Sequence, residues 1–494
     1  MVLVPVGWDV TCVGHDGPVS ELWQLSALEI ARAIRTGKTS SREVVAAHYA
    51  RMDAVNPSLN AVVRRLEATA YAAADAADRA VADGGPLQPL HGVPITVKEN
   101  IDVAGTPTTQ GVPLLADAVA GIDAPAVERM CAAGAIPIAR TNMPDLGLRV
   151  HTHSTLYGLT RNPWNPHVTA GGSSGGEASA IASGMSPLGL GNDIGGSLRN
   201  PAHCCGIASI KPTTGVVPMA TTIPPEDAML SAQVMLAEGP MARHVADVRA
   251  ALTAIAGWSH RDPRSVPAVL TDLSPGEKIT IAVMSDPPGG HTHPDIAAAV
   301  RRAADLLADA GHHVVDAIPP DYDQVPKAWA MLLLGDLYAA RELLNAVMSP
   351  DARTVVDALA DQYPAPTTES MALLQAERFR LARLFSEFFV AYPVLLSPTW
   401  ALPAFDHDAD LRGNDVDEIL RDTLRPVLAG NLLGLPAAVV PCGMAAGLPV
   451  GVQVIGDRFS DLRCLSIAEQ IQDAEGVHTP IDPVVHTPID PVAG

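Results

Sequence analysis

Lys98 lies among residues that would prepare it for proton transfer. The chain has five lysines against 28 arginines, and Lys98 follows the alternating apolar residues Val93, Ile95 and Val97. A lysine at the end of a buried strand loses hydration, which lowers its pKa and makes the neutral amine available. A neutral amine can take a proton from a hydroxyl group. Taken alone, Lys98 would more often be a strand-end lysine whose ammonium reaches water.

A serine pair lies inside a run of four glycines, Gly171–Gly176. Glycines let backbone N–H groups approach a ligand closely and form an anion-binding nest at the start of a helix, although such sequences also occur in plain flexible loops. Gly171-x-Ser173-x-Gly175 matches the nucleophile elbow of α/β-hydrolases, but that motif requires a strand directly before the serine. Residues 162–167 read as a loop, so the elbow is disfavoured.

Ser197 follows two glycines and a short apolar stretch, Leu188–Gly191, that we expect to be a strand. Consecutive glycines let successive N–H groups turn toward one point, as an oxyanion hole requires. The candidate donors are the N–H groups of Ile194, Gly195, Gly196 and Ser197. A tight turn before a helix is the simpler interpretation of the same residues.

Together these segments resemble the amidase signature family. The matching motifs are G-V-P-x-x-V-K ending at Lys98, G-G-S-S-G-G around Ser173, D-x-G-G-S-x-R-x-P around Ser197, and K-P-T from Lys211. The intervals between Lys98, Ser173 and Ser197 are 75 and 24 residues, which are the intervals that this family uses. The resemblance extends from about residue 20 to 472.

The resemblance implies a role for each matched residue. Ser197 would be the nucleophile, Ser173 a bridging serine after a cis peptide bond, and Lys98 the general base. The four N–H groups above would form the oxyanion hole. Gly172, Ser174, Asp193 and Arg199 would support the lysine and the loops. An acyl-enzyme would form, with no metal or organic cofactor. Glu99 replaces a more usual aspartate after the lysine, and residues 202–206 read A-H-C-C-G where A-A-F-C-G is usual, so packing behind the nucleophile differs.

The resemblance also implies hydrolysis of carbon–nitrogen bonds in amides, with esters or carbamates as further substrates. The alternative within the family is an amidotransferase component of the glutaminase type, which uses ammonia to amidate charged tRNA. A binding scaffold without activity is disfavoured because Lys98, Ser173 and Ser197 are all present. Residues of about 220–238 and 320–430 are rich in Ala, Leu and Met, which hints at an apolar acyl or aryl pocket.

Strand and helix patterns alternate along the chain, which predicts the α/β class. We expect a single α/β/α layered domain with a large twisted mixed β-sheet covered by helices, the amidase signature fold. Residues 1–19 would be an N-terminal extension and 20–472 the domain, with its signature core at about 90–215 and a helical pocket region at about 320–430. Residues 473–494 form a Pro-rich tail in which VHTPIDPV occurs twice, at 477–484 and 485–492.

Local signals place several elements of this fold. Ser26-x-x-Glu29 and Ser40-x-x-Glu43 are capping boxes, and Pro57 would close the second helix. Further helices are expected at 67–83, 124–133 and 295–310, and strands at 135–139 and 313–317. The uncharged stretch Pro426–Gly456 is interrupted by prolines and glycines, which predicts strand–turn–strand rather than a membrane span.

The charge and the cysteine content exclude several classes of binding partner. The net charge of −21, from 54 acidic and 33 basic residues, argues against nucleic-acid binding. The six cysteines show no C-x-x-C spacing, so neither a zinc knuckle nor a redox motif is indicated. The N-terminus does not read as a secretory signal. We expect a cytoplasmic monomer or homodimer that acts on a small-molecule amide, ester or carbamate and binds neither nucleic acid nor membrane.

Two H-x-H pairs remain, His151-Thr152-His153 and His291-Thr292-His293. Neither has a third ligand at metal-binding spacing, so we expect solvated or turn histidines and no metal site. The segment 149–157 should lie near the pocket because it directly precedes the glycine-rich loop.

Overall fold

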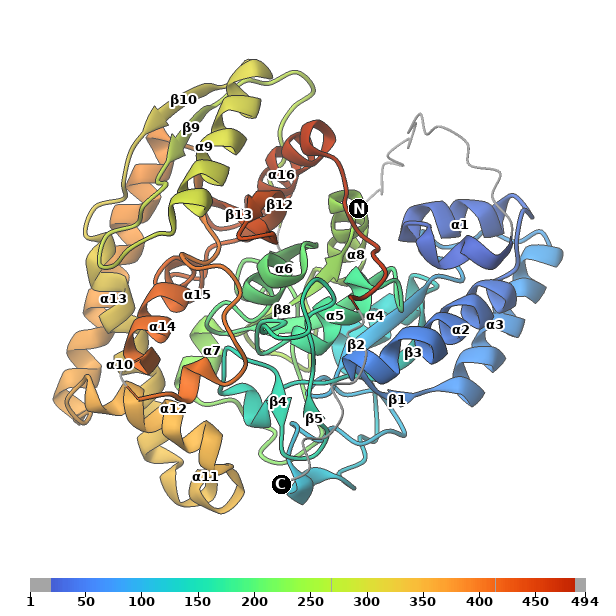
Figure 1. Ribbon diagram of the computed structural model, residues 1–494, viewed down its shortest axis with the longest axis horizontal. Helices are drawn as coiled ribbons and strands as arrows, with labels where there is room; N and C mark the ends of the chain where they lie inside the picture. Colours follow the sequence, from blue (N-terminus) through green and yellow to red (C-terminus); the bar gives the residue numbers. More distant parts are fainter. Residues whose placement is uncertain (1–18, 268, 414, 485–494) are drawn as a thin grey trace, which may run out of the picture.

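A large mixed sheet organises the molecule. The computed structural model describes residues 19–267, 269–413 and 415–484. Within these residues, 11 strands form one sheet in the order β1-β3-β2-β6-β8-β7-β12-β13-β11-β9-β10, and β4 and β5 form a separate hairpin (Figure 1). The strands are β1 Val62–Arg65, β2 Pro94–Lys98, β3 Ile136–Thr141, β4 His153–Ser154, β5 Gly158–Leu159, β6 Leu188–Asp193, β7 Ala208–Lys211, β8 Ala237–Ala242, β9 Thr280–Val283, β10 His313–Asp316, β11 Val394–Pro398, β12 Ala437–Ala445 and β13 Leu448–Gly456.

Parallel pairing is confined to two parts of the sheet. Strand β2 is parallel to both β3 and β6, and β9 is parallel to both β10 and β11. The strands between these groups, from β6 to β11, are paired antiparallel. Lys98 and Asp193 are the last residues of β2 and β6, so the parallel pairing carries both to the same edge of the sheet.

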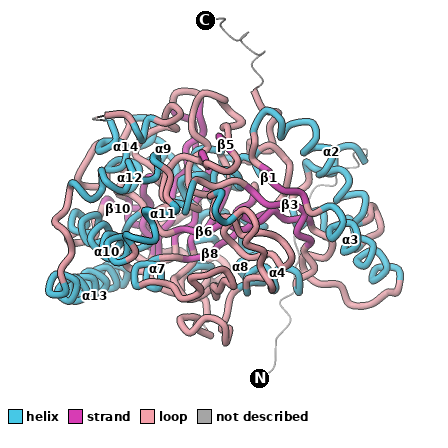
Figure 2. The backbone as a smooth tube through the Cα atoms, turned by 90° about the horizontal axis from the view of Figure 1, so that it is seen from below, coloured by secondary structure: helices cyan, strands magenta, loops and turns pink. Residues whose placement is uncertain are grey.

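Helices cover both faces of the sheet, and the strands run as a band between them (Figure 2). The helices are α1 Ala27–Arg35, α2 Ser41–Leu59, α3 Glu67–Ala82, α4 Pro125–Ala132, α5 Gly175–Ala182, α6 Arg199–Cys205, α7 Leu230–Met235, α8 Val245–Ile255, α9 Pro294–Asp309, α10 Val325–Ala339, α11 Arg341–Val347, α12 Pro350–Asp361, α13 Thr368–Ala391, α14 Asp415–Leu424, α15 Leu428–Leu432 and α16 Asp461–Glu475. Short 3₁₀ turns are η1 Val19–Gln24, η2 Pro113–Leu115, η3 Asp145–Gly147, η4 Tyr322–Gln324 and η5 Ala409–Leu411. The expected α/β fold with a large, helix-covered mixed sheet is confirmed.

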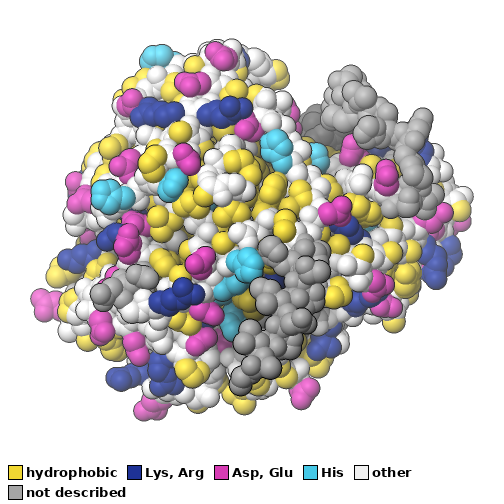
Figure 3. Space-filling model, in the orientation of Figure 1, with side chains coloured by type: hydrophobic (Ala, Val, Ile, Leu, Met, Phe, Trp, Pro, Cys, Tyr) yellow, Lys and Arg dark blue, Asp and Glu magenta, His cyan; other side chains and the backbone are white. Residues whose placement is uncertain are grey.

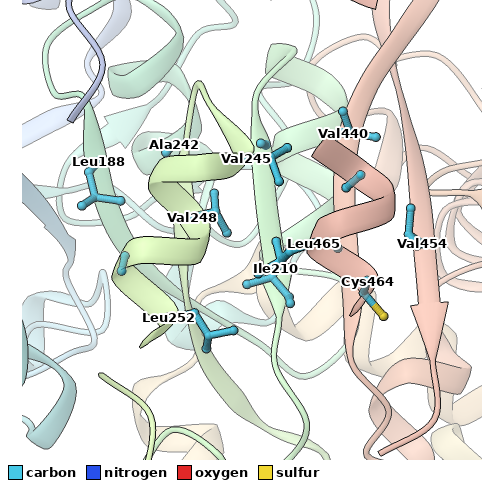
Figure 4. Close-up of a cluster of buried hydrophobic side chains, with 14 of the residues drawn as sticks. Leu188, Ile210, Ala242, Val245, Val248, Leu252, Val440, Val454, Cys464 and Leu465 are labelled. Carbon is cyan, nitrogen blue, oxygen red and sulfur yellow. The ribbon is translucent and has the colours of Figure 1, made fainter. Parts of the chain in front are cut away.

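The alternation of side chains along the strands builds a separate core on each face. In β9, Ile281 and Val283 belong to one core, whereas Ala282 between them belongs to the other. The first core lies under α1, α4, α8, α9 and α16; Figure 4 shows the part of it formed by α8 and α16. There Val248 and Leu465 pack toward strand residues such as Ile210 (Figure 4). Helices α5, α6, α10, α13 and α15 contribute to the cores of the opposite face.

Most local signals in the sequence are confirmed. Both capping boxes are present, at the starts of α1 and α2. The stretch Pro426–Gly456 contains the β12–β13 hairpin, as expected. Pro57 does not close α2: the helix contains it and continues to Leu59, where Asn60 ends it in the left-handed conformation at φ 52°. Proline lacks one N–H, so a single hydrogen bond to the residue four positions earlier is lost, two residues before the helix ends.

The first copy of the tail repeat is bound to the domain. The N–H of Ile481 donates to the carbonyl of Ala182 at 2.9 Å, and Arg51 donates to the Asp482 carboxylate at 2.7 Å. The second copy, 485–492, and most of the expected N-terminal extension lie outside the described residues.

Two surface observations bear on partners. No helix in the described ranges combines the length and apolar character needed to span a bilayer. On the face shown in Figure 3, lysine and arginine side chains are interspersed with aspartate and glutamate, and those that are described form no continuous basic surface.

Candidate active site

Lys98 is a fully buried lysine with two polar contacts. Its Nζ lies 2.7 Å from the Oγ of Ser173 and 2.7 Å from the Oδ1 of Asn192. Burial lowers the pKa of Lys98 to about 7, against the opposing pull of nearby carboxylates, of which Asp193 is the strongest. A large fraction of this amine is therefore neutral near neutral pH. The structure thus brings together Lys98 and Ser173, which are 75 residues apart.

Asn192 is a site residue that sequence reasoning missed. It accepts from Lys98 through Oδ1, and its Nδ2 donates to the Oδ1 of Asn100 at 3.0 Å. These contacts orient the amine toward Ser173. The available signal was its position directly before Asp193, near the end of the apolar strand β6.

The glycine-rich loop is packed so closely that a side chain on Gly171, Gly172 or Gly176 would overlap neighbouring backbone atoms. The peptide between Gly172 and Ser173 is cis, as the family resemblance implies. A Cβ on Gly172 would lie 2.6 Å from the backbone nitrogen of His151. The Oγ of Ser174 donates to the carbonyl of Asn192 at 3.4 Å rather than to Lys98. Ser174 therefore supports the strand end beside the lysine.

Asp193 and Arg199 form a fully buried ion pair at 3.0 Å under the turn that carries Ser197. The Asp193 carboxylate also accepts from the backbone N–H groups of Gly196 at 2.7 Å and Leu198 at 3.1 Å, and from Asn431 Nδ2 at 2.8 Å. Burial by itself raises the pKa of Asp193, but the Arg199 guanidinium and these donors outweigh it and hold that pKa well below its usual range. The turn is consequently fixed to a charge that stays ionised.

The same turn is held from the opposite side by Trp329 of α10. Its indole Nε1 donates to the carbonyl of Ile194 at 2.8 Å, and a Cβ on Gly195 would lie 2.8 Å from the indole ring. The sequence placed residues 320–430 near the pocket but offered no reason to single out Trp329, since its partner lies 135 residues earlier.

Ser173 and Ser197 border one cavity of about 370 Å³. Both serines are largely buried, at 3% and 7% exposure. One wall consists of the apolar side chains of α10, α12 and α14: Trp329, Leu333, Leu337, Val355, Val356, Leu359, Leu420 and Leu424. The rest of the lining includes polar groups, among them Asn100, Gln110, Glu226, Glu238 and Arg264. The size and the mixed lining are typical of a small-molecule site.

Glu238 is the most unusual of these polar groups. It lies on β8 directly opposite Asn192, and its Oε2 is buried without a hydrogen-bond partner in the described structure. Burial raises the pKa of Glu238 to about 8, so the carboxyl group is mostly protonated at neutral pH. It can therefore donate a hydrogen bond into the cavity as well as accept one.

The two H-x-H pairs differ in the structure. We expected solvated or turn histidines; His151 is fully buried, so it is not solvated. The fold also places Asp408 beside His151 and His153, so this pair has a third candidate ligand that its sequence neighbourhood did not provide. His291 is exposed, as expected.

The family model described as Amidase matches residues 43–465. The chain belongs to this family, and it is a hydrolase of carbon–nitrogen bonds in amides.

Particular relatives sharpen this assignment. The chain is 42% identical over 462 residues to an indoleacetamide hydrolase of Bradyrhizobium diazoefficiens, covering 93% of this chain and 88% of the relative. It is 32% identical to a glutamyl-tRNA(Gln) amidotransferase subunit of Chloroflexus aurantiacus, covering 93% and 99%. The crystal structure of a bacterial aryl acylamidase of the amidase signature family superposes with a TM-score of 0.78 at 29% identity, covering 91% and 96%.

Proposed function

We propose that this enzyme hydrolyses a primary amide of a small arylacetic acid, with Ser197 as nucleophile, Ser173 as proton relay and Lys98 as base. The observation that carries the proposal is the 2.7 Å contact between a fully buried lysine and Ser173, in a cavity that Ser197 also borders.

The first step is attack by Ser197 on the amide carbon. The Ser197 proton passes to the Ser173 oxygen as the Ser173 proton passes to neutral Lys98, while the Ser197 Oγ forms a bond to the carbonyl carbon. Burial favours this step because it lowers the pKa of Lys98 to about 7. The carbonyl π electrons move to oxygen and create an oxyanion.

Backbone N–H groups of the turn Ile194–Ser197 would stabilise that oxyanion. The N–H of Gly196 already donates to Asp193 at 2.7 Å, so we assign most of the stabilisation to Ile194, Gly195 and Ser197. Asp193 and Trp329 position this turn from two sides, which would keep the donors oriented before the substrate binds.

The intermediate then collapses with cleavage of the carbon–nitrogen bond. The proton held by Lys98 returns through Ser173 to the leaving nitrogen, and ammonia departs. The acyl group stays on Ser197 as an ester. Water attacks this ester while the same relay removes its proton, and the free acid and Ser197 are released.

The cavity supports an aromatic acyl group. Its wall of leucines, valines and Trp329 would hold a flat apolar ring, whereas the polar side would face the amide. The relative named indoleacetamide hydrolase supports the same substrate class. We further propose that the protonated Glu238 carboxyl binds a polar atom of the substrate, since Glu238 lines the cavity.

The test is ammonia release by the purified chain alone from indole-3-acetamide, phenylacetamide, acetamide and an acetanilide, without ATP or a partner. We expect kcat/KM to be highest for the two arylacetamides. Ser197→Ala should lower kcat/KM by a factor of about 10⁴ or more, with an unchanged melting temperature. Higher kcat/KM for acetanilide would overturn the substrate class. Full activity of Ser197→Ala would overturn the assigned nucleophile.

Glutamine-dependent ammonia transfer is the competing outcome, because a glutamyl-tRNA(Gln) amidotransferase component is also among the relatives. Glutamine added to the same panel distinguishes it. Turnover of glutamine with none of the arylacetamides would favour the amidotransferase alternative.

A further inference from the structure

Two histidines and an aspartate that could together bind a metal ion form a second cluster close to the catalytic cavity. His151 lies just before the β4–β5 hairpin and His153 is its first residue, whereas Asp408 lies more than 250 residues later, just before η5. The Nε2 of His151 is 3.5 Å, and the Nδ1 of His153 is 3.7 Å, from the same Asp408 oxygen. One ligand atom from each residue lies within 4.8 Å of the other two.

The two ring nitrogens that face Asp408 are the Nε2 of His151 and the Nδ1 of His153. Both are buried and lack a hydrogen-bond partner among the described residues. The other nitrogen of His151, Nδ1, lies 2.9 Å from the Oγ1 of Thr169. When Nδ1 donates its proton there, the Nε2 lone pair points toward Asp408, as in histidines that bind metals and donate their second N–H to a fixed acceptor.

The charge around the cluster favours a cation. The Arg149 guanidinium contacts three carboxylates, those of Asp351, Asp408 and Asp410, at 2.7–3.2 Å. One positive charge against three negative charges leaves a formal charge of −2.

We propose that His151, His153 and Asp408 bind a divalent transition-metal ion of the zinc class. Tetrahedral zinc with bonds of about 2.0–2.1 Å to nitrogen and oxygen separates its ligand atoms by about 3.4 Å. The two histidine–aspartate separations, 3.5 and 3.7 Å, lie close to that value. Imidazole and carboxylate are ligands that zinc accepts.

His407 lies beside the cluster, although none of its ligand atoms belongs to the group that lies within 4.8 Å. Its ring lies 5.2 Å from that of His151, and its Nε2 is 2.7 Å from the carbonyl of Pro166. Donation to that carbonyl leaves the Nδ1 lone pair free, and Nδ1 has no partner among the described residues. Water would take the fourth position on the zinc ion.

The role of the ion would be structural. It would tie the segment that backs Gly172 to the segment before η5, whose Asp408 shares Arg149 with Asp351 at the start of α12. Arg149 borders the catalytic cavity, and so do side chains of α12. The ion would therefore hold a cavity wall in place without touching the substrate.

Zinc titration of the tag-free, chelator-treated full chain tests the proposal. Isothermal calorimetry should show one zinc per chain, and zinc should raise the melting temperature, since binding to the folded state stabilises it. His153→Gln should weaken zinc binding by about 100-fold, because one of three ligands is lost. Its melting temperature without zinc should stay unchanged, since His153 is partly exposed.

His291→Gln is the matched control, because it removes an exposed imidazole from the other H-x-H pair. It should bind zinc as the wild type does. Asp408→Asn provides a second ligand variant and should lose affinity as His153→Gln does. Absence of stoichiometric binding in the wild type, or equal affinity in wild type and His153→Gln, would overturn the proposal.

Discussion

The two halves of the cavity are built in contrasting ways. On the side of the two serines, every residue of β2, β6, α5 and α6 is buried. On the apolar side, α10 buries seven of its 15 residues and α12 only two of its 12. The first half is packed without spare room, and the second is a thin layer of helices.

This contrast suggests that the packed half determines the rate of the chemical step and the helical wall determines substrate specificity. Chemistry at Ser197 depends on atoms fixed within fractions of an ångström, which close packing and a buried ion pair provide. Apart from Trp329, which holds the Ile194 carbonyl, the side chains of the helical wall contact only the cavity side of the site, so substitutions among them can change the shape of the cavity without moving the serines.

The largest loss of activity should follow from removing the base, Lys98, which lies in the packed half of the site. We expect Lys98→Ala to lower kcat/KM for an arylacetamide by about 10³-fold or more, and for an activated ester of the same acid by less. An amide needs its leaving nitrogen protonated, whereas a good alcohol leaving group does not. Paired kinetics on both substrates measure the difference. Equal losses would contradict the role of Lys98 as the proton donor to the leaving group.

Asp193→Asn should reduce stability as well as activity. The substitution leaves the Arg199 guanidinium buried without its countercharge, which costs about 3–5 kcal/mol of unfolding free energy. The folded-state pKa of Asp193 is depressed, so the stabilisation exists above the unfolded value of about 4 and is lost as pH falls toward the folded pKa. Urea unfolding at pH 7 and at lower pH measures both effects. Asp351→Asn, in the helical half, should cost far less, because Asp351 is half exposed.

The pH profile should follow the neutral amine. Because the pKa of Lys98 is about 7, the base is protonated below that pH, and kcat/KM should fall about tenfold per pH unit on the acid side. Burial also lowers the pKa of Lys211 to about 7, although Lys211 donates to the Pro212 carbonyl and does not border the cavity. Lys211→Met should therefore keep the same acid limb. Loss of the limb in that variant would assign it to Lys211.

The smallest effects should come from the helical wall. Leu333→Ala removes apolar contact and should raise KM for indole-3-acetamide about tenfold, with little change for acetamide. A small effect is also expected at Glu238, which lies on β8 outside the helical wall: Glu238→Gln keeps the shape of the side chain but not its titration, and should change kcat/KM only a few-fold. Steady-state kinetics on both amides separate the two. A large loss on acetamide in Leu333→Ala would show that the wall also positions the serines.

Local signals explain which elements the sequence predicted well. The capping boxes at Ser26 and Ser40 and the alternation in β2 act within one turn or one strand, so each can be read from neighbouring residues. Pro57 was misjudged because a proline in the last turn of a helix disrupts few bonds.

The contacts that Asn192, Trp329 and Asp408 make with distant segments could not be predicted from the sequence. Asn192 became a partner of Lys98 only when β2 and β6 paired, and Trp329 met Ile194 across 135 residues. The same holds for Asp408 beside His151. Nothing in the composition of these segments specifies that they meet.

The sequence by itself determined the family, the α/β class and the identities of Lys98, Ser173 and Ser197 as candidates, because glycine-rich turns and strand ends impose local backbone requirements that few residues satisfy. Tertiary structure alone decided what surrounds them: the apolar wall, the unpartnered Glu238 and the histidine–aspartate cluster. These depend on how sheet and helices pack, and packing energy is shared among many weak contacts that no short stretch of sequence records.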